Sequence, residues 1–286
     1  RLHPGKMLLV DTVKGKVIDD NELKEGYAKM QPYGEWLDSH LVQLKDIKIP
    51  NLPVEEYTKE ERMRLQKAFG YTYEEYRSSI GKMALNGVEA TASMGIDTPL
   101  AVLSHEHQPL FNYFKQLFAQ VTNPPIDCIR EEIVTSTSVY VGRDGNLLEE
   151  EPKNCQVLKI NNPILTNTDM LKIKNMKVEG FKAVTVPITY YKSAPLDRAM
   201  DRLFVEVDRA HRAGANILIL SDRGVDENHV AIPSLLAVSA VHQHLVKTKK
   251  RTSLAIILES GEPREVHHFA TLLGYGACAI NPYLAL

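Results

Sequence analysis

The chain has 286 residues, of which 44% are apolar and 24% charged, and its formal net charge is −2. These values are typical of soluble globular proteins, and this length suits one large domain or one domain with an appendage. The small net charge gives no electrostatic reason to expect binding to nucleic acid or to an anionic membrane, and no stretch approaches the roughly 20 apolar residues of a membrane span. We therefore expect a cytoplasmic protein that binds neither.

Neither end of the sequence resembles the natural end of a chain. Residues 1–5 contain no initiator methionine and no apolar signal region, and residues 281–286 stop on apolar side chains. We expect both ends to be cuts within a longer protein.

The first 54 residues predict a small appendage. Apolar runs at residues 7–10 and 17–18 on either side of a turn at Lys14 and Gly15 indicate a strand pair. A helix is predicted over residues 21–29, with Asp20 as its N-cap. Residues 49–53 contain two prolines and no clear period, which is typical of a connector.

From about residue 55 the chain is predicted to become helical. Residues 60–69 have a helical pattern, and Thr72 begins a capping box for a second helix over residues 73–86. Phenylalanine and leucine recur at steps of three and four over residues 108–121, which predicts a third helix with a broad apolar face. Asn123, Pro124 and Pro125 then end it.

The second half alternates apolar, β-branched runs with helical stretches such as residues 196–213 and 233–247. Continuous apolar runs joined by helices indicate buried parallel strands in βαβ units. Four strands are too few for a complete eight-stranded barrel. We therefore predict an α/β fold with a partial, rudimentary βα-barrel-like parallel sheet and flanking helices, preceded by a helical segment and a short N-terminal β/helix appendage. The four predicted strands are residues 183–188, 217–221, 254–258 and 277–280.

Polar side chains follow these strands, at the edge where parallel sheets and barrels usually hold reactive groups. Asp222 and Arg223 follow the second strand, and Glu259 follows the third. A free-standing α/β enzyme or a small-molecule-binding module could use this rim, and would then need a deep pocket with converging acids and shifted pKa values. The same residue types also cap helices and form turns in βα loops, so the sequence favours a structural role.

No metal site is expected from the histidines and cysteines. His105 and His107, like His242 and His244, are two residues apart, which does not place both side chains on one helix face. The cysteine spacing matches no zinc or iron–sulfur motif and indicates reduced thiols. The cysteines are Cys128, Cys155 and Cys278.

Two further motifs have structural interpretations. Residues 274–277 contain two glycines but follow a helix and precede a strand, whereas a phosphate-binding loop has the opposite order, so we interpret them as a helix end and turn. The basic residues 247–251 are predicted to form a solvated loop after a helix.

Several segments have distinctive sequences. They are residues 4–7 with 10–11, 68–72, 93–104, 113–127 with 130–131, 220–223, 274–277 and 281–285. All but the first closely resemble the central domain of the glutamate synthase large chain, and the first resembles the end of that family's glutamine amidotransferase domain. Together the segments extend over essentially the whole chain.

The resemblance implies a defined place in a multidomain enzyme. Members of this family release ammonia from glutamine at an N-terminal cysteine. They pass it through a tunnel to a flavin domain, where 2-oxoglutarate becomes a 2-imino acid and then glutamate. FMN and a 3Fe-4S cluster belong to the domain after the central one, and electrons come from reduced nicotinamide through a small partner subunit or from ferredoxin. The central domain resembles a rudimentary, cofactor-free relative of the FMN barrel.

None of these catalytic parts can be placed on this sequence. The nucleophile would lie upstream of Arg1, and the cluster cysteines and flavin contacts would lie downstream of Leu286. We therefore expect no catalytic, cofactor-binding or metal-binding residue, and an inactive chain that links the neighbouring amidotransferase and FMN domains. Residues 1–54 are interpreted as the amidotransferase tail plus a linker, and residues 55–286 as the central domain.

One docking edge is also predicted. The helix ending at Val121 and the stiff residues 123–125 would form a rigid edge for a neighbouring domain, because paired prolines restrict the backbone.

Overall fold

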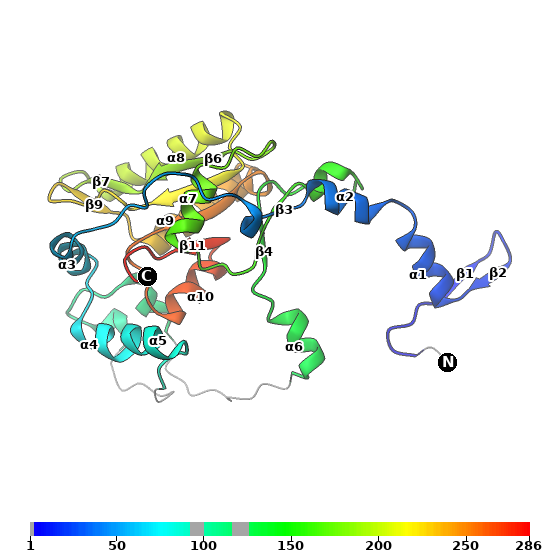
Figure 1. Ribbon diagram of the computed structural model, residues 1–286, viewed down its shortest axis with the longest axis horizontal. Helices are drawn as coiled ribbons and strands as arrows, with labels where there is room; N and C mark the ends of the chain where they lie inside the picture. The colour runs from blue at the N-terminus through cyan, green and yellow to red at the C-terminus, as the bar shows by residue number, and fades with distance from the viewer. Residues whose placement is uncertain (1–2, 92–99, 116–125) are drawn as a thin grey trace. The chain divides into compact units, whose positions relative to one another are not determined.

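The computed structural model (Figure 1) describes residues 3–91, 100–115 and 126–286, apart from the side chains at 132 and 133. The chain divides into two compact units. The first combines residues 1–41 with 145–156, and the second combines residues 42–144 with 157–286. No helix in the described part of the chain is long and apolar enough to cross a membrane.

The first unit begins with the predicted β-hairpin, in which Leu9 pairs with Ile18 and Asp11 with Lys16. Two helices follow, and the second lies in a stretch where the sequence pattern predicts no element. The elements of this unit are β1 (Leu9–Asp11), β2 (Lys16–Ile18), α1 (Asp20–Ala28), α2 (Tyr33–His40) and the 3₁₀ helix η5 (Pro152–Cys155).

The predicted N-cap of α1 is wrong by one residue. The carboxylate of Asp19 accepts the amide hydrogens of Asn21 and Glu22, so Asp19 is the cap. Asp20 instead accepts from the Met7 amide at 2.9 Å and from the ammonium groups of two lysines, Lys6 and Lys24. The contacts of Asp20 with Lys6 and Met7 thus leave Asp19 to cap the helix.

Four parallel strands form the central sheet of the second unit, in the order β11-β10-β8-β6. Within this sheet, neighbouring strands follow one another in chain order, and all residues of β8 and β10 are buried. The predicted strands and their parallel arrangement are therefore confirmed, with bounds that differ by up to two residues. The strands are β6 (Ala183–Pro187), β8 (Ile217–Ser221), β10 (Ala255–Glu259) and β11 (Ala279–Asn281).

Three helices connect these strands, and their apolar residues pack against one face of the sheet. Leu218, Leu220 and Ile256 of the sheet share a buried cluster with Leu203 and Val241 of the helices. The amphipathic pattern of the sequence predicts this face, because apolar residues recur at helical spacing. The helices are α8 (Leu196–Arg212), α9 (Ser234–Lys247) and α10 (Val266–Gly274).

A fourth helix and a small mixed sheet cover the opposite face. Ile217, Ile219 and Ile257 point to this side and share a second buried cluster with Met170 and Ile173. The small sheet has the order β3-β5-β4, and its strands of two or three residues are too short to leave a sequence period. The elements are α7 (Asn167–Lys174), β3 (Val42–Gln43), β4 (Val139–Val141), β5 (Leu158–Ile160) and the 3₁₀ helix η1 (Leu44–Asp46).

The helical segment after residue 55 is confirmed, and both of its helix starts carry capping boxes. Thr58 exchanges hydrogen bonds with Glu61, and Thr72 does the same with Glu75. The second predicted helix forms one run that changes from α to π and back. The elements are α3 (Lys59–Ala68), α4 (Tyr73–Glu75), the π-helical turn η2 (Tyr76–Ile80) and α5 (Gly81–Asn86).

The helix predicted over residues 108–121 is wrong in its described part. The structure has a 3₁₀ helix, η4 (Leu110–Phe114), and the rest of the prediction lies outside the described residues. The ring of Phe111 is fully buried and stacks on His268 of α10 at 4.3 Å. The carbonyl of Phe111 is 2.9 Å from Nε2 of His267, also on α10. In an α-helix the Phe111 carbonyl would accept a hydrogen bond from the backbone four residues later. Here it contacts His267 of α10 instead, so a tertiary contact overrides the helical pattern.

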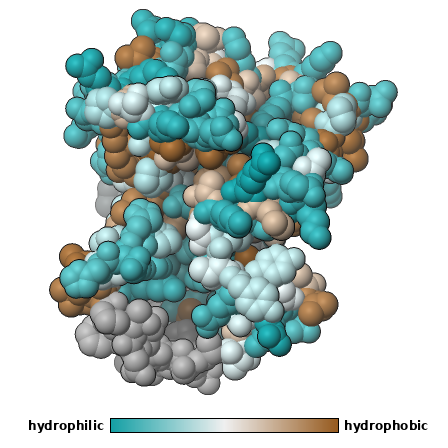
Figure 2. Space-filling model, turned by 90° about the vertical axis from the view of Figure 1, so that its left-hand side faces the viewer, coloured by the Kyte–Doolittle hydropathy of each residue, from teal (hydrophilic) through white to brown (hydrophobic). Residues whose placement is uncertain are grey.

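The remaining elements are short. Two strands pair antiparallel beside the main sheet, with Thr189 opposite Ala231. The face shown in Figure 2 is mostly hydrophilic, with hydrophobic residues in separate groups. The remaining elements are β7 (Thr189–Tyr191), β9 (His229–Ala231), α6 (Cys128–Val134) and the 3₁₀ helices η3 (Ala101–Leu103) and η6 (Arg251–Ser253).

Candidate functional site

The last residues of three neighbouring strands bring polar side chains together at the carboxyl end of the sheet. Ser221 ends β8, Glu259 ends β10 and Asn281 ends β11, and the strand register sets Glu259 opposite both of the others. All three residues are buried. Because side chains alternate along a strand, they share the face that also carries Ile219 and Ile257.

Glu259 is the centre of this cluster. Its carboxylate accepts hydrogen bonds from Nζ of Lys174 at 2.7 and 2.8 Å, Nε of Arg223 at 2.8 Å and Oγ of Ser221 at 2.6 Å. Burial alone would raise the pKa of Glu259, but the bonds from Lys174 and Ser221 outweigh it and hold the pKa below its ordinary value. The carboxylate is thus charged and saturated with donors.

Arg223 ties the strand end to the segment that precedes α3. Its guanidinium lies 4.0 Å from the centre of the Tyr283 ring and donates to the hydroxyl of Tyr57 at 2.9 Å. A second, more exposed ion pair joins it to Glu55 at 3.3 Å. Stacking on a ring while donating to two separate partners needs the planar arginine head group, which lysine lacks.

Asp222 belongs to a separate cluster with the loop after β10. Its carboxylate accepts from Oγ of Ser260 at 2.5 Å and from the amide of Gly261 at 3.1 Å. Burial raises the pKa of Asp222 to about 7, against the effect of these hydrogen bonds. The Tyr283 hydroxyl is buried close to this carboxyl group, and burial and the Asp222 charge raise its pKa.

Arg264, which the sequence analysis did not single out, fastens the helical segment over the same end of the sheet. It is 2% exposed and donates to the carbonyls of Phe69 and Gly70 at 3.1 and 3.0 Å, and it forms an ion pair with Glu75. The hydroxyl of Tyr71 donates to the carbonyl of Gly261 at 2.8 Å. Only spatial proximity identifies these contacts, since their partners lie nearly 200 residues apart.

The close packing at this end of the sheet also explains why residue 261 is a glycine. A Cβ atom added at Gly261 would lie 2.8 Å from the Phe69 ring and 3.1 Å from the Tyr283 hydroxyl. The loop after β10 therefore has no room for a side chain. Residues 57–75, which we call the covering segment, contact this end of the sheet through Tyr57, Phe69 and Tyr71. The covering segment occupies the space through which a ligand would approach the strand ends from this side.

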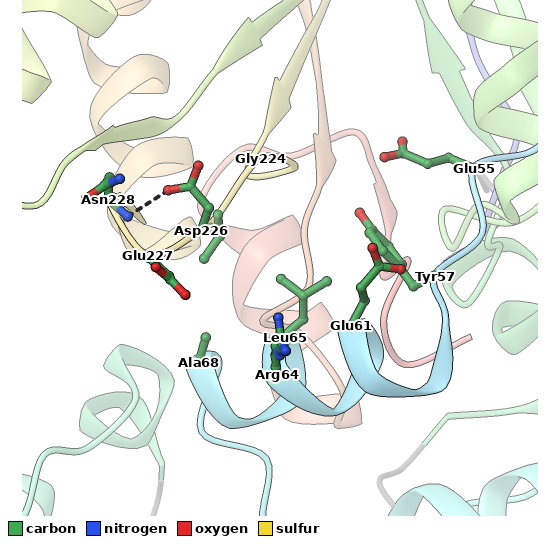
Figure 3. Close-up of a pocket in the computed structure, with 11 residues that line it drawn as sticks. Glu55, Tyr57, Glu61, Arg64, Leu65, Ala68, Gly224, Asp226, Glu227 and Asn228 are labelled. Carbon is green, nitrogen blue, oxygen red and sulfur yellow. Dashed lines mark hydrogen bonds between the residues drawn. The ribbon is translucent and has the colours of Figure 1, made fainter.

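A cavity of about 730 Å³ lies beside the filled region, between α3 and the loop after β8. Figure 3 shows Leu65 and Arg64 on the α3 side, with Asp226 and Asn228 on the facing loop. Three of its four carboxylates have partners: Glu61 caps α3, Asp226 accepts from the amides of Asn228 and His229, and Glu55 pairs with Arg223. The residues around it include Glu55, Tyr57, Glu61, Arg64, Leu65, Ala68 and 224–228.

The structure brings the three rim residues of the sequence analysis into one region, but not into that cavity. Arg223 bonds to Glu259, and Asp222 lies in the neighbouring cluster. None of the three lines this cavity, and their charged groups are paired with neighbouring side chains or backbone amides. Their arrangement is that of a buried, internally paired polar layer.

The other sequence motifs have mixed outcomes. Residues 274–277 form the expected helix end: Gly276 has φ 116°, and a Cβ there would lie 2.5 Å from Nδ1 of His242. The basic loop is correctly placed after α9, but Lys250 pairs with Asp208 at 2.7 Å instead of remaining solvated. Within the described residues, no group of three or more His, Cys, Asp or Glu side chains is placed to hold a metal ion. The predicted docking edge at residues 121–125 lies outside the described residues.

Comparison with known proteins identifies two families. Residues 64–286 match the profile of the glutamate synthase central domain, and residues 1–36 match that of the class-II glutamine amidotransferases. The whole chain is 46% identical to the large chain of glutamate synthase [NADPH] from Bacillus subtilis. It is 42% identical to glutamate synthase [NADH] from Schizosaccharomyces pombe, and 40% to ferredoxin-dependent glutamate synthase 1 from Arabidopsis thaliana.

The chain spans 18%, 14% and 18% of the lengths of these three relatives. The central domain profile alone covers well over half of the chain. The chain therefore belongs to the glutamate synthase central domain family.

Proposed function

We propose that this chain is the linking domain of a glutamate synthase, and that it couples a glutaminase domain to an FMN domain without catalysing a reaction itself. The observation that carries the proposal is the filled carboxyl end of the parallel sheet. Barrel enzymes hold their active sites at that end, whereas here Glu259 is neutralised by Lys174 and Arg223, and Arg264 secures a covering segment.

A barrel-like origin of the fold agrees with this role. The sheet order follows the chain order without reversal, as in βα barrels, and Ile164 adds a parallel bridge to Ile280 beyond β11. The face that would line a barrel interior is packed by α7 and the small sheet. We propose that the domain is a partial barrel whose interior holds structural elements in place of a cofactor.

The proposed domain division places residues 1–54 in the amidotransferase tail and linker, and residues 55–286 in the central domain. Exposed apolar side chains on the helical segment support contact with neighbouring domains, since Tyr73 is 76% and Leu85 86% exposed. FMN, a 3Fe-4S cluster and electron delivery by a small subunit or ferredoxin are assigned to other parts of a cytoplasmic parent enzyme. The NADPH, NADH and ferredoxin in the names of relatives accord with such a parent.

Ligand binding tests the absence of a catalytic role. Melting temperatures of the chain would be measured with FMN, glutamine, glutamate and 2-oxoglutarate, each over a range of concentrations. A non-catalytic linker should show no saturable stabilisation, because only a ligand that binds the folded state raises the melting temperature. Saturable stabilisation by any of the four would favour the alternative of an enzyme or a ligand-binding module.

The linking role is tested in an intact glutamate synthase that contains this sequence. Arg264→Lys should weaken the covering segment, reducing glutamine-dependent glutamate synthesis several-fold while leaving synthesis from free ammonia nearly unchanged. Arg209→Lys, at an exposed pair with Glu206, is the matched control and should affect neither activity. Equal loss of both activities in Arg264→Lys would contradict a role confined to coupling.

A further inference from the structure

A second cavity, far along the chain from the rim residues, contains an incompletely paired lysine. Lys172 of α7 is 9% exposed, and its ammonium group donates to the carbonyl of Leu44 at 3.2 Å. Among the described residues it makes no other hydrogen bond and no ion pair. An ammonium has three donors, and burying it with one neutral partner is unfavourable unless another acceptor is supplied.

The cavity around Lys172 has both positive charge and apolar walls, which suits a ligand with a hydrogen-bond acceptor and an apolar part. The cavity has a volume of about 730 Å³ and lies between residues 42–52 and the C-terminal end of α7 with the residues that follow it. Its charged residues are three lysines and one aspartate, which gives a formal charge of +2. They are Lys48, Lys172, Lys177 and Asp46.

The remaining walls are mainly aliphatic. Val42, Ile47, Ile49, Met176 and Val178 all line the cavity. Ligand sites commonly combine apolar walls with a few fixed polar groups, and a volume of this size lies in their usual range of roughly 300–1,000 Å³. Lys48 and Lys177 also take part in no ion pair among the described residues.

We propose that this cavity binds a small organic acid, with its carboxylate on Lys172 and its aliphatic part against Ile47, Ile49 and Met176. The carboxylate supplies the acceptor that the buried ammonium lacks, and a charge-assisted hydrogen bond of this kind is among the stronger polar contacts. The cavity shares no lining residue with the clusters around Glu259 and Asp222, so the inference does not depend on the linking role.

The test uses hexanoate with the whole 286-residue chain and follows the melting temperature. Hexanoate should raise it saturably, whereas hexylammonium, which has the same chain and the opposite charge, should not. Inorganic phosphate should bind at least tenfold more weakly, because it cannot use the apolar walls. No effect of hexanoate, or an equal effect of hexylammonium or phosphate, would overturn the proposal.

Substitutions locate the binding. Lys172→Met keeps the length of the side chain, removes the charge and should weaken hexanoate binding at least tenfold. Lys247→Met, at an exposed residue at the end of α9, is the matched control and should bind like the unchanged chain. Unchanged binding in Lys172→Met would place hexanoate elsewhere and refute the assignment.

A second variant serves if Lys172→Met does not fold cooperatively. Ile49 is 63% exposed, so Ile49→Glu should preserve the fold while adding a carboxylate to the cavity wall. That carboxylate should compete for Lys172 and weaken hexanoate binding at least tenfold. Binding of hexanoate that is unaffected by Ile49→Glu would count against the site.

Discussion

Asp222 shows how the fold changes the chemistry of a single residue. The carboxyl group is 1% exposed, and its pKa is raised from the ordinary 3.8 to about 7 by burial. Because the folded state then holds the proton more tightly than the unfolded state, protonation stabilises the fold. The contribution is complete below pH 3.8, declines as the pH rises and is lost above about pH 7.

Asp222→Asn should remove this pH dependence. The unfolding free energy of the unchanged chain minus that of the variant should be larger at pH 5 than at pH 8, by on the order of 2 kcal/mol. Urea denaturation at the two pH values measures it. His268, whose pKa burial lowers to about 3, has the opposite pH dependence, but it is present in both proteins and cancels in the difference.

Asp226→Asn is the control for this experiment. Asp226 is exposed, and hydrogen bonds from the Asn228 and His229 amides lower its pKa. Its contribution is therefore lost as the pH falls, opposite in sign to that of Asp222. A pH dependence in Asp222→Asn equal to that of the unchanged chain would show that Asp222 titrates as an ordinary carboxyl group.

Loss of the Glu259 charge should cost more stability than loss of its partner Lys174. Glu259→Gln would leave Lys174 and Arg223 without their shared carboxylate, and breaking a buried ion pair in this way costs about 3–5 kcal/mol. Lys174→Met should cost less, since the Lys174 side chain is 30% exposed and Glu259 retains Arg223. Urea denaturation of both variants measures the two losses of unfolding free energy, and the loss should be larger for Glu259→Gln.

Glu206→Gln provides the reference for an exposed ion pair. Its partner Arg209 is largely solvated, and such pairs contribute about 0–1 kcal/mol. If Glu259→Gln proved no more destabilising than Glu206→Gln, the polar layer would not be a structural element of the sheet.

At the scale of elements, Arg264 connects the loop after β10 to the end of α3 and to α4. Arg264→Lys loses the planar fork that reaches two carbonyls and Glu75. Amide hydrogen exchange in residues 59–75 should therefore accelerate at least tenfold, while exchange in β8 and β10 stays unchanged. Uniform acceleration across the chain would mean that Arg264 stabilises the whole fold and not this contact.

The elements with strong periodicity could be predicted from the sequence. The runs at 217–220 and 254–258 are fully apolar, and the spacing of Leu203 and Val207 reflects the buried face of α8. Prediction failed where a distant partner decides the local structure. Phe111 follows a helical pattern, yet its contacts with His267 and His268 hold it in a 3₁₀ turn.

The site could be predicted only in part, for the same reason. Parallel strand ends must lie along one edge, which correctly groups Asp222, Arg223 and Glu259. Their partners could not be inferred, because Lys174 and Tyr57 lie on other elements and no local pattern indicates the pairing. Whether an acid at a strand end is available or neutralised depends on those partners.

At the scale of the whole molecule, stability should differ greatly between elements. All five residues of β8 and of β10 are buried, whereas β1 and β2 form an isolated hairpin with exposed apolar residues such as Val10 and Val17. Two-stranded hairpins are marginally stable by themselves. Hydrogen exchange of the whole chain should be slowest in β8 and β10 and fastest in β1 and β2, and comparable protection in the hairpin would contradict this.

The order of the parallel strands has a consequence for how the protein forms. β8, β10 and β11 each pair with the strand of this sheet that precedes them in the chain, so every new strand closes a loop no longer than one helix and its connections. Loop closure of that length carries a modest entropic cost, and short sequence separation favours fast folding. The sheet can therefore grow one βα unit at a time as the polypeptide leaves the ribosome, with β6 and β8 joined before β11 has been translated.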